Sequence, residues 1–330
     1  MRIRVFEKAD LPEVMNLWNA SAAAGEVAYK PLTAEIFQTK FLLSPHYSPE
    51  YSLVAEEDGR VIGFVNGIYK KIFLPKETPE NTPGYLTVIF VDASHRHRGV
   101  GTALLKALTD AFSQAGKKTI SCSGNNPVNL PWLVPGTHGH DHNNAPGVEV
   151  DCAGYGFLLK QGFEDKYSEV AMYLNLADYV PPPDLRERQE RLLAEGIQTG
   201  RYDVSLGCDF DRMCDRVGSE YWRKVLFDET HAQTPRPILA AVHEGHIVGF
   251  TGPVDREPSG RGWFTGICTD PVFECRGIAT VLFNLLMQEF IACGAAFSTL
   301  FTGKENHAQR LYLRTGFQVV RRFAIMSRVL

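Results

Sequence analysis

Two apolar stretches of the chain are each followed by glycine and then by a helical pattern. YLTVIFVDAS (85–94) and WFTGICTDPV (263–272) are mostly apolar, β-branched or aromatic, which predicts buried strands. After each stretch, apolar residues recur at helical spacing, over 100–115 and 278–293. Each helical pattern ends near a glycine, which is a common C-terminal stop signal. The chain therefore repeats one strand–loop–helix unit.

The elements around these units repeat as well. Upstream of each unit, apolar residues flank a two-residue turn, Asp58-Gly59 or Glu244-Gly245, which predicts a β-hairpin. Helical patterns precede both hairpins, at 11–22, 33–43 and about 210–226. Both copies finish with a strand, a helix, a Gly-Phe pair and a further strand. A period this long predicts a duplicated domain, because the repeats of solenoid proteins are much shorter.

Length and a proline-rich segment divide the chain into two domains. A chain of 330 residues exceeds the usual size of a single core. ADYVPPPDLRERQERLLAEG has three prolines before a charged helical pattern, which is typical of a linker. We therefore predict a first domain at 1–178, a linker at 179–200 and a second domain at 201–330. The first domain carries a 24-residue insertion near 125–148, where Pro, Gly, Asn and His dominate.

The composition is that of an ordinary globular protein, and it narrows the classes of partner. Apolar residues make up 44% of the chain, charged residues 22%, and the formal net charge is -4. This charge predicts no nucleic-acid partner, and no run approaches the ~20 apolar residues of a membrane span. The seven cysteines form no CxxC pair, so we expect reduced thiols and a cytoplasmic protein without membrane partners.

The loops that join strand to helix have the composition of an anion site. HRHRGVGT (95–102) places basic residues before Gly99 and Gly101. Helix N-termini offer backbone N–H groups without intrahelical partners, and glycine lets a phosphate approach them closely. One such loop could equally be a solvated basic turn, but its recurrence as ECRGIAT (274–280) favours a phosphate or pyrophosphate site. The pattern GxxxxGK[ST] is absent, and Leu104 replaces the third glycine of a dinucleotide fingerprint.

The two loops resemble the acetyl-CoA signature of the GNAT (Gcn5-related N-acetyltransferase) superfamily, V-x-P-x-x-(R/Q)-x-x-G-x-(G/A). The first copy, VDASHRHRGVG, departs from it at Ala93, and the second, TDPVFECRGIA, at Glu274. A later family motif, N-x-x-A-x-x-x-Y-x-x-x-G-F, is nearly met by NHAQRLYLRTGF through Tyr312, whereas the first copy has Leu158 at the tyrosine position. The resemblance covers essentially the whole chain apart from the linker and the insertion. The layout is similar to that of mycothiol synthase, a tandem GNAT protein.

The resemblance implies an α+β fold of two tandem GNAT domains, each a mixed, mostly antiparallel central sheet flanked by helices. It implies an N-acyltransferase that moves an acetyl group from acetyl-CoA to an amine of a small molecule or peptide, by direct attack in a ternary complex. A non-catalytic CoA-binding sensor or scaffold is the alternative. Tyr312 would assist departure of the thiolate, so we expect catalysis in the second copy, in a monomer or homodimer. The residues expected to bind CoA are Ile89, Val91, Arg96, His97, Arg98, Gly99, Val100, Gly101, Thr102, Ile267, Thr269, Arg276, Gly277, Ile278, Ala279, Thr280 and Asn306.

Two further groups of polar residues allow different roles. THGHDHNN (137–144) contains three histidines and an aspartate, which could hold zinc in a metal-dependent hydrolase. Their order does not match the HxHxDH pattern of metallohydrolases, so we predict no metal site and expect the segment to cover an acceptor pocket. Glu149 and Asp151 suit the N-terminus of the following helix, with a general-base role as the alternative.

Overall fold

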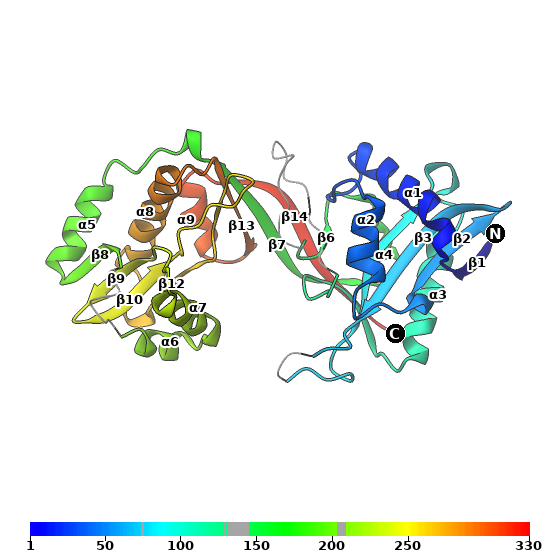
Figure 1. Cartoon of the computed structure of the whole chain (residues 1–330), viewed down its shortest axis with the longest axis horizontal. Helices are drawn as coiled ribbons and strands as arrows, with labels where there is room; N and C mark the ends of the chain where they lie inside the picture. The colour runs from blue at the N-terminus through cyan, green and yellow to red at the C-terminus, as the bar shows by residue number, and fades with distance from the viewer. Residues whose placement is uncertain (74–75, 129, 131, 133–144, 203–208) are drawn as a thin grey trace. The chain divides into compact units, whose positions relative to one another are not determined.

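The chain folds into two compact units. The computed structural model describes residues 1–73, 76–128, 130, 132, 145–202 and 209–330. Unit 1 consists of Met1–Val170 together with Arg321–Leu330, and unit 2 of Ala171–Val320. Figure 1 traces the chain through both units. No helix among the described residues is long and apolar enough to cross a membrane.

Unit 1 follows the order of elements that the sequence predicts for the first copy. Its elements are β1 (Arg2–Val5), α1 (Leu11–Ala23), α2 (Ala34–Phe37), β2 (Ser52–Glu57), β3 (Arg60–Tyr69), β4 (Gly84–Val91), α3 (Val100–Gln114), β5 (Thr119–Cys122), β6 (Val148–Glu149), α4 (Ala153–Lys160), the first part of β7 (Glu164–Asn175) and the end of β14 (Gln318–Val329). The hairpin at Asp58-Gly59 and the helix predicted at 11–22 are confirmed. The helix predicted at 33–43 is α2 continued by a π-helical turn, Gln38–Leu42.

The sheet of unit 1 includes the last strand of the whole chain. Its strand order is β1-β2-β3-β4-β5-β14, in which β4 and β5 are parallel, and β6 pairs with β14. The ladder between β14 and β5 joins Met326 to Cys122 and continues to Val329 and Thr119. This differs from the predicted second domain, 201–330, because the apolar residues at the end of β14 are buried against the first copy.

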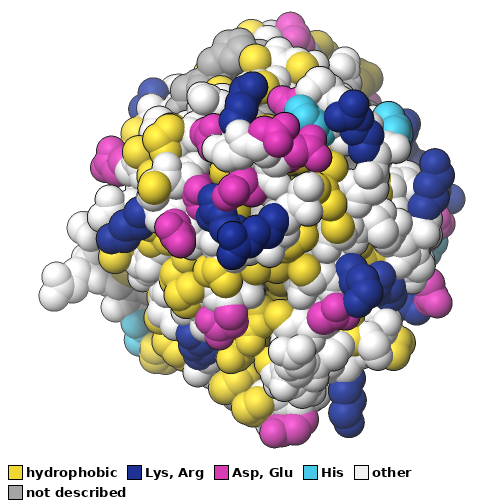
Figure 2. Space-filling view, turned by 90° about the vertical axis from the view of Figure 1, so that its right-hand side faces the viewer, with side chains coloured by type: hydrophobic (Ala, Val, Ile, Leu, Met, Phe, Trp, Pro, Cys, Tyr) yellow, Lys and Arg dark blue, Asp and Glu magenta, His cyan; other side chains and the backbone are white. Residues whose placement is uncertain are grey.

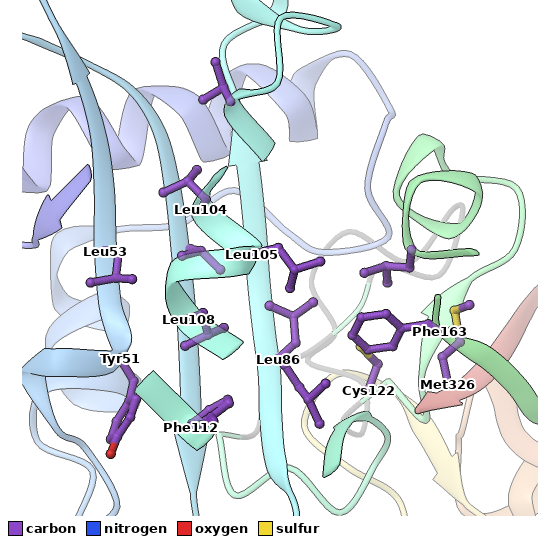
Figure 3. Packing of buried hydrophobic residues seen from close by; sticks show 14 of the residues in the cluster. Tyr51, Leu53, Leu86, Leu104, Leu105, Leu108, Phe112, Cys122, Phe163 and Met326 are labelled. Carbon is purple, nitrogen blue, oxygen red and sulfur yellow. The ribbon is translucent and has the colours of Figure 1, made fainter. Parts of the chain in front are cut away.

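The core of unit 1 lies between α3 and the sheet. Leu104, Leu108 and Phe112 lie on one face of α3 and are fully buried. Figure 3 shows these side chains against Leu53 and Leu86 of the strands. The helical spacing of apolar residues after Gly99 is therefore the spacing of a face packed on a sheet.

Unit 2 repeats the plan with differences in detail. Its elements are the end of β7, α5 (Leu185–Ala194), β8 (Ile197–Arg201), α6 (Asp211–Val217), α7 (Glu220–His231), β9 (Leu239–His243), β10 (His246–Thr251), β11 (Arg261–Trp263), β12 (Ile267–Thr269), α8 (Ile278–Ala292), β13 (Phe297–Gly303), α9 (Ala308–Arg314) and the start of β14. One sheet has the order β12-β10-β9-β8, and β11 pairs with β13 in parallel. The mixed, mostly antiparallel sheets flanked by helices confirm the predicted fold class.

Two predictions for unit 2 need correction. The predicted helix at 210–226 is two helices, because Gly218 ends α6 in the left-handed conformation (φ 70°) and the Ser219 side chain caps α7. The predicted linker at 179–200 contains α5, as its charged pattern suggests, but also most of β8. Ile197 at the start of β8 is fully buried, so this strand is part of the unit 2 sheet.

Charged side chains of both signs are interspersed on the face that Figure 2 shows. Hydrophobic side chains lie between them. This face therefore shows no large region of one charge sign.

Candidate functional site

The two glycine loops have the same backbone conformation. His97 and Cys275 have positive φ angles of 60° and 62°, and Gly99 and Gly277 follow at 85° and 90°. Glycine is favoured at the second position because a side chain there is strained, although a Cβ on Gly99 would meet nothing within 4 Å. The shared conformation supports the duplication inferred from the sequence.

Each loop leaves the first N–H groups of a helix without intrahelical acceptors. Gly99 and Gly277 are the N-caps of α3 and α8, and neither helix has a side-chain cap. The first helical hydrogen bond of α3 runs from Ala103 N to Gly99 O, 2.9 Å. The N–H groups of residues 100–102 therefore remain available to an anion, as do those of residues 278–280 in unit 2.

A cavity of about 580 Å³ adjoins the loop of unit 1. It is lined by the loop itself, by β4, by α4, by the segment after α1 and by Phe323 of β14. The cavity of about 120 Å³ in unit 2 is lined by other elements and includes none of residues 277–280. Of these two cavities, only the one in unit 1 meets the helix N-terminus that follows a glycine loop.

The edge of β4 that faces β5 has no strand partner beyond Tyr85 in the β4–β5 ladder, and residues 86–91 line this cavity. The parallel ladder between β4 and β5 consists of Gly84↔Ile120 and Tyr85↔Ser121. On the other side, β4 pairs with β3 as far as Val91, and Asp92 N donates to Ile62 O at 2.9 Å. Backbone groups alternate along a strand, so those of Ile89 and Val91 face away from β3.

This orientation has a counterpart in unit 2. Asp270 N donates to Val248 O at 2.9 Å, so Ile267 and Thr269 of β12 face away from β10 in the same way. The predicted strand at 263–272 is divided here into β11 and β12.

The basic residues of the first loop differ in their surroundings. Arg96 donates two hydrogen bonds to Glu26, at 2.8 and 2.7 Å, and a third to Val91 O at 3.1 Å. The Arg96 guanidinium lowers the pKa of Glu26. His97 and Arg98 are exposed, and His97 lines the cavity. Arg96 thus joins the segment after α1 to the loop, which the sequence pattern did not indicate.

The corresponding polar residues of unit 2 contact their own neighbours. Arg276 is exposed, lies over the Phe273 ring and donates to Glu195 at 3.2 Å. Glu274 is exposed, and Asn306 accepts a hydrogen bond from Ala308 N at 2.9 Å at the start of α9.

Tyr312, the predicted catalytic residue, lies in an aromatic core. Its side chain is 6% exposed, and its ring centroid is 5.8 Å from that of Phe264, 5.0 Å from Phe283 and 6.3 Å from Phe317. Burial raises its pKa to about 12. Neither the 580 Å³ nor the 120 Å³ cavity is lined by Tyr312. Leu158, at the matching position of unit 1, does line the larger cavity.

The cavity also contains polar groups that the sequence pattern did not place there. Glu149 and Cys152 line it, together with Tyr29 from the segment after α1. Glu149 belongs to β6, and α4 begins at Ala153, so Glu149 is not the helix-end carboxylate that we expected. Its alternation with apolar residues at 148 and 150 was the available signal for a strand.

The histidine-rich segment 137–144 lies outside the described residues, so neither its covering role nor its lack of metal is tested. Among the residues that are described, no group of three or more His, Cys, Asp or Glu side chains could hold a metal ion.

Comparison with known proteins links both units to one family. The profile of the Acetyltransferase (GNAT) family matches residues 12–131 and 207–317. The L-2,4-diaminobutyric acid acetyltransferase of Nocardia farcinica (strain IFM 10152) is 33% identical over 88 residues, which are 26% of this chain and 42% of that protein.

Three solved structures are similar over 99% of the chain. The first is a glucosamine N-acetyltransferase region of a fungal multi-domain GH3 β-N-acetylglucosaminidase, with a TM-score of 0.61 and 18% identity over 38% of that chain. The second is a GCN5-related N-acetyltransferase from Sphaerobacter thermophilus, with a TM-score of 0.56 and 18% identity over 95% of that chain. The third is a tandem GNAT protein from the clavulanic acid biosynthesis pathway, with a TM-score of 0.52 and 15% identity over 98% of that chain. The chain spans less than half the length of the Nocardia protein and of the fungal protein. These structural likenesses establish the fold.

Proposed function

The chain belongs to the acetyltransferase (GNAT) family, with two such domains in tandem, and we propose that it transfers an acetyl group from acetyl-CoA to an amine in the cavity of unit 1. The observation that carries this proposal is that one cavity meets both a helix N-terminus and an unpaired strand edge. The amine acceptor is in keeping with the name of the Nocardia relative, which acts on a diamino acid.

The walls of the cavity suit the parts of acetyl-CoA. The N–H groups of Val100, Gly101 and Thr102 would bind the pyrophosphate, with His97 beside them. The unpaired backbone groups of Ile89 and Val91 would bind the pantetheine arm as a neighbouring strand does. Bound acetyl-CoA supplies a thioester whose carbonyl carbon an amine can attack directly.

The open edge of β4 would also stabilise the transition state. When the amine attacks, negative charge develops on the thioester oxygen, and an N–H group already fixed in place lowers the energy of that charge. The N–H of Val91 faces the cavity edge, whereas the Val91 carbonyl already accepts from Arg96. The Arg96–Glu26 pair would therefore hold this part of the strand in position.

We propose that unit 2 supports the fold and does not carry out the transfer. It has the same loop conformation, but residues 277–280 do not line the 120 Å³ cavity, and Tyr312 is buried among aromatic side chains. One observation favours the alternative of a non-catalytic CoA-binding protein. Unit 1 has Leu158 at the position of the motif's tyrosine, and a leucine cannot donate a proton to a leaving thiolate. Binding of acetyl-CoA without thiol release, over a wide panel of amines, would support that alternative.

The two copies allow a matched test of the binding site. Gly101→Glu places a carboxylate beside the proposed pyrophosphate, and an alanine-sized group fits there because an ideal Cβ lies 3.4 Å from the Phe157 ring. Two unit charges about 5 Å apart repel by ~3 kcal/mol at an effective dielectric constant of 20, or about 100-fold in affinity. Ala279→Glu makes the same change in unit 2.

Calorimetric titration with acetyl-CoA should give one site per chain. We expect Gly101→Glu to lose about 100-fold in affinity and Ala279→Glu to bind as the wild type does. The reverse result would assign the site to unit 2, and unchanged binding in both variants would exclude these loops.

A further inference from the structure

The part of the cavity away from the glycine loop is mainly apolar. Val128, Leu130 and Ala145 are buried side chains from the segment between β5 and β6, and they line the cavity with Phe90 of β4. Phe323 of β14 completes this wall and is 1% exposed. A molecule beside these residues would bury hydrocarbon and not make many hydrogen bonds.

One carboxylate stands in this apolar wall. Glu149 is the register partner of Phe323 in the β6–β14 ladder, and opposite residues of antiparallel strands point to the same face. The Glu149 side chain is 10% exposed. Arg321, two residues before Phe323 on β14, donates from Nη1 to Glu149 Oε1.

The ion pair leaves part of this carboxylate available. A buried carboxylate needs a counter-charge, and Arg321 supplies it through one of the two oxygens. Glu149 Oε2 has no hydrogen-bond partner among the described residues. This oxygen can therefore accept a hydrogen bond from a molecule in the cavity.

No other described side chain of the cavity offers a comparable anion. The second carboxylate of the lining, Glu26, accepts both of its charged hydrogen bonds from Arg96. Burial raises the pKa of the Cys122 thiol to about 12 and also raises the pKa of Cys152, so both thiols are neutral near pH 7. The cavity thus combines one available carboxylate with an apolar wall.

We infer that Glu149 binds and deprotonates the acceptor, and that the acceptor is a primary monoamine on an apolar body, such as an arylalkylamine. This inference rests on the acetyl transfer proposed for unit 1. The ammonium would donate to Glu149 Oε2 while its hydrocarbon packs against Phe323 and Leu130. A polyamine would bring further positive charges, for which the described lining has no second available carboxylate, and an amino sugar would place several hydroxyls against the apolar side chains of the wall.

The reaction balances with Glu149 as the base. The ammonium gives one proton to Glu149, and the free amine then forms the C–N bond with the thioester carbon. The C–S bond breaks, and its electron pair leaves on sulfur. The nitrogen loses its second proton to the thiolate, giving the amide and CoA, and Glu149 returns its proton to water. Arg321 contacts Glu149 and not the acceptor, so it is a positioning residue.

The test uses the full chain with acetyl-CoA and benzylamine, measured by thiol release. Glu149→Gln keeps the shape of the side chain and removes the base, so kcat/KM for benzylamine should fall by about 10²- to 10⁴-fold. Acetyl-CoA affinity should stay within error of the wild type, whereas Tm should fall because Arg321 loses its charged partner. The control is Glu164→Gln, an exposed carboxylate of unit 1 that should leave all three values unchanged.

Arg321 variants separate positioning from a structural role. Arg321→Ala should raise KM for benzylamine and lower kcat, whereas Arg321→Lys, which keeps the charge, should recover part of both. Equal activity of Arg321→Ala and Arg321→Lys, or wild-type kinetics in Glu149→Gln, would overturn the inference.

Different experimental results would contradict the acceptor class and the proposed function. With the wild type, kcat/KM for benzylamine should exceed that for spermidine and glucosamine by at least 10-fold. Preference for spermidine or glucosamine would overturn the acceptor class while leaving acetyl transfer in place. Failure of the wild type to bind acetyl-CoA, or to release thiol with any amine, would overturn the proposed function itself.

Discussion

Met326→Ala tests whether the last strand of the chain stabilises the first copy. Met326 is fully buried in the core of unit 1 and lies near Cys122 and Phe163 (Figure 3). Truncating a buried methionine to alanine costs about 2–5 kcal/mol, because apolar contact is lost and a cavity is left behind. That is a large share of the 5–15 kcal/mol typical of a folded domain. For a unit of this size, it corresponds to a fall in Tm of roughly 4–20 °C.

The unit that loses protection from hydrogen exchange in Met326→Ala shows which unit the last strand stabilises. Val329→Ala, on the same strand but 78% exposed, is the control and should change stability by less than about 0.5 kcal/mol. Hydrogen exchange followed by mass spectrometry should show lost protection in β4, β5 and α3 of unit 1, with β9, β10 and α8 of unit 2 unchanged. Lost protection confined to unit 2 would refute the assignment of Arg321–Leu330 to unit 1.

Two further predictions concern the buried side chains of Tyr312 and Cys122. Tyr312→Phe keeps the ring within the aromatic core of unit 2, so turnover should stay within about twofold of the wild type; a fall of about 10²- to 10⁴-fold would move catalysis to the second copy. Burial raises the pKa of Cys122 to about 12, so it should resist iodoacetamide at pH 8, whereas the exposed Cys275 and Cys293 should react. Peptide mass mapping checks this order, and early modification of Cys122 would contradict it.

The repeated pattern of the sequence predicted the local structure well. Gly99 and Gly277 follow apolar strands and precede apolar helices, and both loops have the conformation that this arrangement requires. The hairpin turns were equally predictable, because Asp-Gly and Glu-Gly pairs favour the backbone angles of a tight turn. These features depend on residues close together in the chain.

Features that depend on distant residues were not predictable in this way. The alternation of β14 identifies a strand but says nothing about which sheet it joins, and its last residues pair with β5 of the first copy. The loop sequence shows that Arg96 is basic but not that Glu26, far away in the chain, neutralises it. Glu149 lies beside Phe323 for the same reason, because β6, near the middle of the chain, pairs with β14 close to its C-terminus.

Tyr312 matches the family motif, but the motif does not describe the space around the tyrosine. The motif places a hydroxyl near the glycine loop, but side-chain volume decides whether a ligand can enter there. Unit 1 has leucines at positions 86, 105 and 158, where unit 2 has Phe264, Phe283 and Tyr312.

Leu86 and Leu158 line the unit 1 cavity, so the larger rings of Phe264 and Tyr312 at the matching positions are expected to leave less open space in unit 2. The two loops therefore share a conformation, whereas the 580 Å³ cavity lies beside the loop of unit 1. From this difference in volume we expect one acetyl-CoA per chain. The loop sequences, taken alone, would have predicted two.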